Sequence, residues 1–216
     1  PYLGIYAKQD GVHLRIIAHA NTVSEAKELI RPVEDELVNS MGSNVWGFDN
    51  DTPEAAVGQV LTEKGMTLAT MESCTGGMLA SHITDQPGSS KYFMGGLVTY
   101  TNETKVQHGV SSTVIEQYGE ISQEMADAMA DAARQRLGAD VGIGITGVAG
   151  PAERDNKPVG TVFISIRMDG KCKRISLRLP SRRTVIKSRS TTTALVELRR
   201  LINGGIGKER TSESAL

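Results

Sequence analysis

The chain has 216 residues, of which 39% are hydrophobic and 23% are charged, and its formal net charge is −1. This composition is ordinary for a soluble globular protein, and the length suits one large domain or a medium domain joined to a small one. No run of about eighteen apolar residues occurs, which argues against a membrane span, and no signal-peptide pattern stands at the N-terminus. Two widely spaced cysteines fit a reducing compartment, so we expect a cytoplasmic protein. Because the first residue is Pro1 and not Met, we expect a fragment of a longer protein.

The positions of the cysteines and of the charged residues indicate which kinds of site and ligand to expect. Cys74 and Cys172 lie far apart and lack CxxC spacing, which argues against a disulfide framework and a zinc site. Between Arg167 and Arg210 there are thirteen Lys/Arg residues and three acidic ones. A basic face on a nearly neutral protein fits an anionic small molecule better than long nucleic acid, and a solvated basic surface is the plain alternative.

The first fifty residues read as a separate small domain. Segments 3–6 and 13–18 are strand-like around a turn at 9–11, and a helix follows from Thr22 or Ser24 with apolar side chains at helical spacing. Residues 44–47 predict a short strand, so residues 1–50 should form a ββαβ unit of the α+β class. Its core would be too small to make this unit stable on its own.

Residues 51–203 predict a larger α/β domain. Helices are expected at 53–64, 76–84, 111–118, 122–137 and 181–202, and strands at 66–71, 96–101, 141–146, 161–168 and 172–179. The alternation of strands and helices favours a three-layer α/β/α sandwich with a mixed, mostly parallel sheet. Residues 204–216 are polar, and we expect them to form a flexible tail.

The turn that joins the strand at 66–71 to the helix at 76–84 is the most informative segment. It reads Glu72-Ser73-Cys74-Thr75-Gly76-Gly77, which places hydroxyl groups and two glycines at a helix N-terminus. Unpaired N–H groups there attract an anion, and glycine lets a ligand approach the backbone closely. The turn could hold a phosphate or present a nucleophilic serine, and by itself it does not decide between them.

Three further segments follow strands or begin a helix: residues 99–105, residues 146–161, and Arg182–Arg183 at the start of the last helix. Ligands of open α/β sheets gather beyond the carboxyl ends of strands, so we expect these segments and the turn to meet in one pocket.

A serine nucleophile needs a base, and none of the four histidines lies in a strand-end segment of residues 51–203. Lys105 can serve as the base if its surroundings lower its pKa, with Tyr100 as its helper, and Arg183 suits a phosphate. A surface lysine, a packed tyrosine, a helix-capping Ser73 and a solvated arginine are the plain alternatives. The residues alone therefore allow an acyl-transfer hydrolase or a nucleotide-binding module without chemistry. Neither a metal-ligand cluster nor a P-loop or dinucleotide fingerprint is visible.

Five segments in order resemble one family: 72–77, Pro87-Gly88-Ser89-Ser90, 98–105, Thr146-Gly147-Val148-Ala149-Gly150-Pro151, and Lys157-Pro158-Val159-Gly160-Thr161. Together they make residues 51–203 similar to the CinA C-terminal domain, which includes nicotinamide mononucleotide (NMN) deamidases. The resemblance implies an amidohydrolase that converts NMN to nicotinate mononucleotide and ammonia without a metal or cofactor. It implies Ser73 as nucleophile, with Tyr100 and Lys105 as its activating partners.

The remaining site residues are assigned on the same hypothesis. Backbone N–H groups near Thr75, Gly76 and Gly77 are expected to stabilise the oxyanion, and Arg183, with Thr146 and Gly147, to hold the ribose phosphate. The chain departs from many relatives in two places: loop 150–157 lacks their Gly-Pro-x-Gly-Gly pattern, and Lys187 stands where they often have arginine.

Residues 1–50 resemble the KH-type linker domain of full-length CinA proteins, which implies that a larger N-terminal domain precedes this chain in the whole protein. No GxxG loop occurs in residues 1–50, so nucleic-acid binding is not expected and a structural linker is. The sequence leaves a homo-oligomer open.

Overall fold

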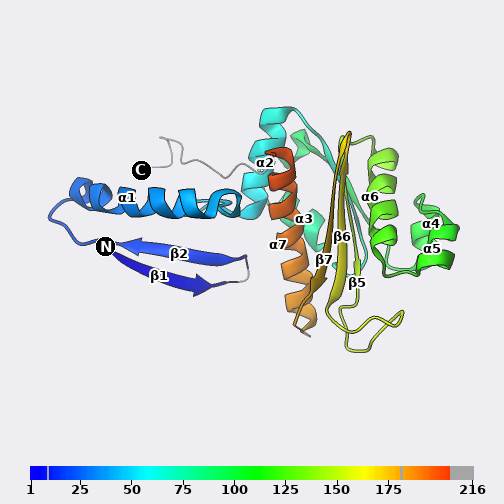
Figure 1. The fold of residues 1–216 in the computed structure, drawn as a ribbon. Coiled ribbons are helices and arrows are strands. Elements are labelled where there is room, and N and C mark those ends of the chain that lie inside the picture. Colours follow the sequence, from blue (N-terminus) through cyan, green and yellow to red (C-terminus); the bar gives the residue numbers. More distant parts are fainter. Residues whose placement is uncertain (9, 181, 205–216) are drawn as a thin grey trace.

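The computed structural model describes residues 1–8, 10–180 and 182–204. A β-hairpin and a long helix project from one side of a larger body in which helices flank a central sheet (Figure 1). The chain therefore has the α/β architecture that the sequence predicts, preceded by a small N-terminal unit.

The central sheet has five strands: β3 (Leu68–Glu72), β4 (Phe93–Val98), β5 (Val141–Gly147), β6 (Thr161–Met168) and β7 (Lys171–Arg178). Their order is β4-β3-β5-β6-β7. β3 runs parallel to both of its neighbours, and β6 runs antiparallel to both of its own. Four strands thus point the same way and one is reversed, which is the mixed, mostly parallel sheet that was predicted.

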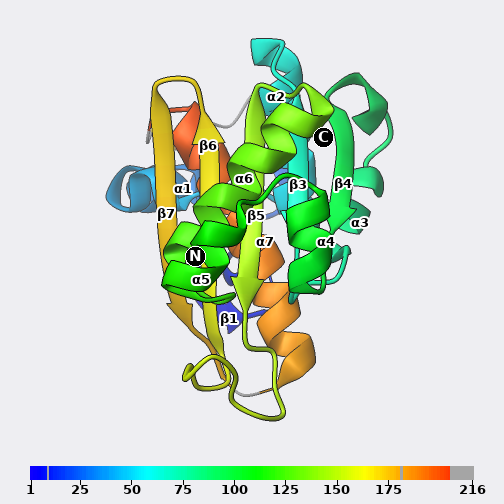
Figure 2. The same cartoon turned by 90° about the vertical axis from the view of Figure 1, so that its right-hand side faces the viewer.

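Helices cover both faces of this sheet. α2 (Pro53–Lys64), α3 (Met78–Thr84) and α7 (Arg183–Ile202) lie on one side, where α2 and α3 both contact α7 (Figure 1). α6 (Gln123–Leu137) crosses the other face over β3, β5 and β6, with α4 (Asn102–Gln107) and α5 (Ser112–Tyr118) beside it (Figure 2). The result is the predicted three-layer sandwich.

Two glycines of β5 let α6 approach the sheet directly. A Cβ atom at Gly142 would lie 2.0 Å from the carbonyl oxygen of Ala130, and one at Gly144 would lie 2.1 Å from that of Ala126. A side chain at either position would push the helix away and weaken the close packing that a core requires. The alternating glycines of this strand therefore fix one helix layer.

The N-terminal unit contains β1 (Tyr2–Ala7), β2 (Val12–Ile17) and α1 (Val23–Met41), and the Thr22 side chain caps α1. The strand predicted at 44–47 is wrong. A 3₁₀ turn, Gly42–Asn44, ends at the first residue of that segment, and residues 45–47 form neither helix nor strand. The carbonyl groups of Ser43 and Val45 instead accept hydrogen bonds from Arg200 and Arg199 of α7, at 3.1 and 3.2 Å. The segment is held to α7 and does not pair with the hairpin.

Two other predictions near the site need correction. The strand predicted at 96–101 ends at Val98, and the segment after it, predicted as a loop, contains helix α4. The Thr101 hydroxyl caps this helix by accepting a hydrogen bond from the Thr104 N–H at 3.3 Å. The Thr104 hydroxyl in turn accepts one from the Thr101 N–H at 3.2 Å. The predicted tail, 204–216, lies outside the described residues after Gly204. Within the described ranges, no helix is long and apolar enough to cross a membrane.

Candidate active site

A cavity of about 320 Å³ lies beyond the carboxyl ends of β3, β4 and β5. Its size falls in the range of small-molecule sites, roughly 300–1,000 Å³. Six of the residues expected at the site line it: Ser73, Tyr100, Lys105, Thr146, Gly147 and Arg183. Thr75, Gly76 and Gly77 are not among its lining residues. The topology therefore brings together residues that are more than a hundred positions apart.

The turn after β3 presents Ser73 to the cavity. The Ser73 N–H donates to the Ile145 carbonyl at 2.9 Å, which ties the turn to β5. Gly76 and Gly77 then adopt φ angles of 62° and 89°, in the left-handed region that favours glycine. These glycines allow a sharp turn from strand to helix, which leaves Ser73 at the carboxyl end of β3 with 9% of its surface exposed.

The buried carboxylate of Glu72 fills the N-terminus of α3. It accepts hydrogen bonds from the N–H groups of Gly77 (3.1 Å), Leu79 (3.1 Å) and Ala80 (2.8 Å). The Gly77 amide that we expected to face an oxyanion is thus already engaged, and the Gly76 amide donates to the Ser73 carbonyl. Within the described part of the chain, the amides of Cys74 and Thr75 make no hydrogen bond. Of these two residues Cys74 lines the cavity and Thr75 does not, so the Cys74 N–H is the donor left for an oxyanion.

A thiol lies next to the serine, but its chemistry argues against a nucleophilic role. Cys74 is 5% exposed, and burial raises the pKa of its thiol to about 12, with the Glu72 charge adding to the effect. The thiolate is the reactive form of cysteine, so Cys74 stays protonated and unreactive near neutral pH. Ser73 is therefore the better candidate at this turn.

Lys105 of α4 is almost fully buried, with 1% of its surface exposed. Its Nζ atom donates to Asn102 Oδ1 at 3.1 Å and lies 4.0 Å from Glu120 Oε2. Burial lowers the pKa of Lys105, and Glu120 opposes that shift. No hydrogen bond joins Ser73 to Lys105 among the described residues, although such bonds are often loose before a substrate binds.

Arg183 and Tyr100 meet at the cavity. Arg183 Nη2 donates to the Tyr100 hydroxyl at 2.9 Å, and Nη1 donates to the Gly150 carbonyl at 2.9 Å. Tyr100 is 57% exposed, which makes this pair part of the accessible wall. The Thr146 hydroxyl, by contrast, is buried and donates to the Glu120 carbonyl at 2.8 Å.

Sequence reasoning missed Glu120 and Arg154, which form an ion pair in the same cavity. Glu120 lies between two helices and not after a strand. A search for residues beyond the carboxyl ends of strands therefore does not find it. Arg154 lies in the loop after β5, where only the departure from the glycine-rich pattern marked the segment.

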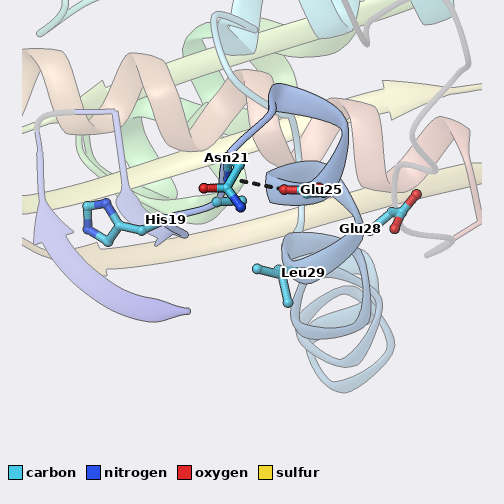
Figure 3. Close-up of a pocket in the computed structure, with 6 residues that line it drawn as sticks. His19, Asn21, Glu25, Glu28 and Leu29 are labelled. Carbon is cyan, nitrogen blue, oxygen red and sulfur yellow. Dashed lines mark hydrogen bonds between the residues drawn. The ribbon is translucent and has the colours of Figure 1, made fainter.

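A second hollow, of about 700 Å³, lies on the N-terminal unit between the end of β2 and the start of α1 (Figure 3). The Glu25 carboxylate accepts a hydrogen bond from the Asn21 N–H at 3.1 Å, so it stabilises the N-terminus of α1. The hollow holds no pairing of a nucleophile with a base. Across the described chain, no group of three or more His, Cys, Asp or Glu is placed to hold a metal ion.

Two family descriptions match the chain: "CinA C-terminal domain" over residues 50–202 and "Damage-inducible protein CinA KH domain" over residues 1–47. A protein of Alkaliphilus oremlandii named as competence-damage inducible is 41% identical over 202 residues, covering 93% of this chain and 49% of its own length. A CinA-like protein of Synechocystis is 42% identical over 93% of this chain and 49% of its own length. The chain thus spans about half the length of the curated relatives it matches.

Solved structures agree with these matches. A competence/damage inducible protein from Agrobacterium tumefaciens has a TM-score of 0.66 at 33% identity, covering 69% of this chain and 93% of that one. A CinA superfamily protein from Escherichia coli has a TM-score of 0.66 at 31% identity, covering 74% of this chain and 98% of that one.

Proposed function

The chain belongs to the CinA family, with a CinA C-terminal domain preceded by a CinA KH domain, and from this we propose that it hydrolyses the carboxamide of NMN. The products are nicotinate mononucleotide and ammonia. The observation that carries the proposal is the buried Lys105 amine, which lines the same cavity as Ser73 and has a lowered pKa. A lysine that releases its proton more readily is a suitable general base.

The first half of the reaction forms an acyl-enzyme. Neutral Lys105 takes the proton of the Ser73 hydroxyl as Oγ attacks the carboxamide carbon, and the carbonyl oxygen becomes an oxyanion. The Cys74 N–H, which lacks an acceptor among the described residues and belongs to a residue that lines the cavity, is the proposed donor to that oxyanion. Lys105 then gives its proton to the departing nitrogen, the C–N bond breaks, and ammonia leaves.

The second half returns the enzyme to its starting state. Lys105, again neutral, takes a proton from water as the water oxygen attacks the acyl carbon. The proton passes to Ser73 Oγ as the ester bond breaks, which releases the carboxylic acid. Tyr100 is the proposed helper of Lys105: its hydroxyl accepts from Arg183, so its own proton stays free to be donated.

The phosphate is assigned to the Arg183 side of the cavity. Arg183 is exposed, its guanidinium is already directed along the wall by Tyr100 and Gly150, and the first turn of α7 contains no acidic residue. A planar guanidinium binds phosphate oxygens in a bidentate way. The N-terminus of α3 is a poor alternative because Glu72 already occupies it.

Incubation with NMN, with ammonia and nicotinate mononucleotide both quantified, tests the proposal. We expect equal amounts of the two products from the wild type and loss of both in Ser73→Ala. Ser81→Ala is the matched control, because this exposed serine lies on α3 just beyond the turn. Binding of NMN without ammonia release would instead indicate a nucleotide-binding module, and normal turnover by Ser73→Ala would exclude Ser73 as the nucleophile.

A further inference from the structure

One carboxylate at the edge of the cavity faces two basic side chains. Glu120, in the turn between α5 and α6, forms an ion pair with Arg154 through one oxygen, while the other oxygen lies 4.0 Å from Lys105 Nζ. Its side chain is 15% exposed, so solvent screens these charges only in part. The proposed reaction uses neither Glu120 nor Arg154.

The loop that carries Arg154 is held against the Glu120 turn. Arg154 and Lys157 exchange backbone hydrogen bonds at 3.2 and 2.9 Å, which closes a tight turn. Asp155 Oδ2 accepts from the Ile121 N–H at 3.1 Å, directly beside Glu120. These contacts place Arg154 over the carboxylate.

The arrangement matters because of what an unshared carboxylate would do to the lysine. A carboxylate about 4 Å from an amine favours its protonated form, and a protonated lysine cannot take a proton from serine. A cation bound to the same carboxylate weakens that effect. The charged and titratable groups that face Lys105 from the elements around it are Glu120, Arg154, Asp155, Cys74 and, on its own helix, Glu103.

We propose that Arg154 and Glu120 are positioning residues that act on the reaction through Lys105. Arg154 engages the Glu120 carboxylate and keeps it from pairing fully with the lysine amine, so the amine remains able to accept the serine proton. The inference rests on the proposed function in that it treats Lys105 as the base. Glu120 raises the pKa of Lys105 and Arg154 lowers it, which are the directions that this arrangement requires.

Three variants and a control test this. In Arg154→Gln, the rising limb of kcat/KM against pH should move to higher pH by about one unit. In Glu120→Gln it should move to lower pH by about one unit, and the double variant should behave like Glu120→Gln. Arg154→Lys should restore the wild-type limb in large part. Lys157→Gln removes a positive charge from the same loop and should leave the limb unchanged.

An NMR titration of the Lys105 side chain, assigned by its absence in Lys105→Met, gives the same comparison without turnover. If NMN is not hydrolysed but the titration moves as described, the proposed function fails and the coupling of Arg154 and Glu120 to Lys105 stands. An unmoved titration in Arg154→Gln would overturn the inference. So would an Arg154→Gln shift that is equally large with and without Glu120, because Arg154 would then not act through the carboxylate.

Discussion

The backbone N–H of Ala80 donates to the carboxylate of Glu72 at 2.8 Å, across the turn that carries Ser73. The last residue of β3 is thereby joined to the first turn of α3. A buried charge with several amide donors is well satisfied, and the turn gains a brace that a bound anion would otherwise have to supply. Ser73 lies between the two ends of this brace.

Glu72→Gln should therefore loosen the turn. The amide keeps one acceptor but directs an NH₂ group toward backbone donors, so we expect a loss of about 1–3 kcal/mol in the free energy of unfolding. We also expect kcat to fall more than KM changes, because Ser73 loses its fixed position. Urea unfolding and steady-state kinetics measure both effects, with Glu116→Gln on the exposed side of α5 as the control. An unchanged unfolding midpoint would show that the brace contributes nothing.

Cys74 should be insensitive to thiol reagents. Burial raises its pKa to about 12, whereas Cys172 is exposed on β7. Iodoacetamide near pH 8 should label Cys172 first while amidase activity remains, as peptide mass spectrometry can follow. Fast labelling of Cys74 with parallel inactivation would instead identify a reactive thiol at the site.

Ser73→Ala should lower kcat by roughly 10⁴- to 10⁶-fold, the scale seen when members of a nucleophile–base unit are removed. Lys105→Met should cause a loss on the same scale, and the double variant should be little worse than either single one, because the two residues act in one step. Single-turnover assays with NMN measure these losses. Additive losses would show that the serine and the lysine act independently.

The buried lysine should also affect stability, with a defined sign. Because its pKa is lowered from 10.5 in the fold, the unfolded chain binds a proton that the folded protein has released, between the lowered value and 10.5. Stability therefore rises with pH across that window. Lys105→Met should remove this contribution and, at neutral pH, raise the free energy of unfolding by about 1–2 kcal/mol. Urea unfolding from pH 7 to 10 compares the two slopes, and parallel slopes would contradict the prediction.

Arg183→Gln should raise KM for NMN about tenfold or more, since a hydrogen bond to a charged group contributes roughly 1.5–3 kcal/mol. The KM for nicotinamide riboside, which lacks the phosphate, should change little. Arg182→Gln, one residue earlier and exposed, is the matched control. Equal losses for both substrates would place the phosphate elsewhere.

Much of the larger domain follows from local patterns. The apolar and glycine run of β5 and the helical spacing of apolar side chains in α2 and α6 are sufficient to locate these elements. The strand expected at 44–47 failed because the partners of this segment are arginines more than 150 positions away. Glu120 escaped for the same reason: its importance comes from Arg154, 34 positions later, and no local period encodes such a contact.

The loop between β5 and β6 has two parts with different surroundings. Ala149 and Val159 at its stems pack into the hydrophobic core, while residues 151–154 at its tip are exposed. A change in the length or charge of the tip therefore alters the wall of the cavity without a cost to the core. This segment can therefore change as an exchangeable insert while the scaffold stays the same, and the ion pair of Arg154 with Glu120 in the cavity changes with it.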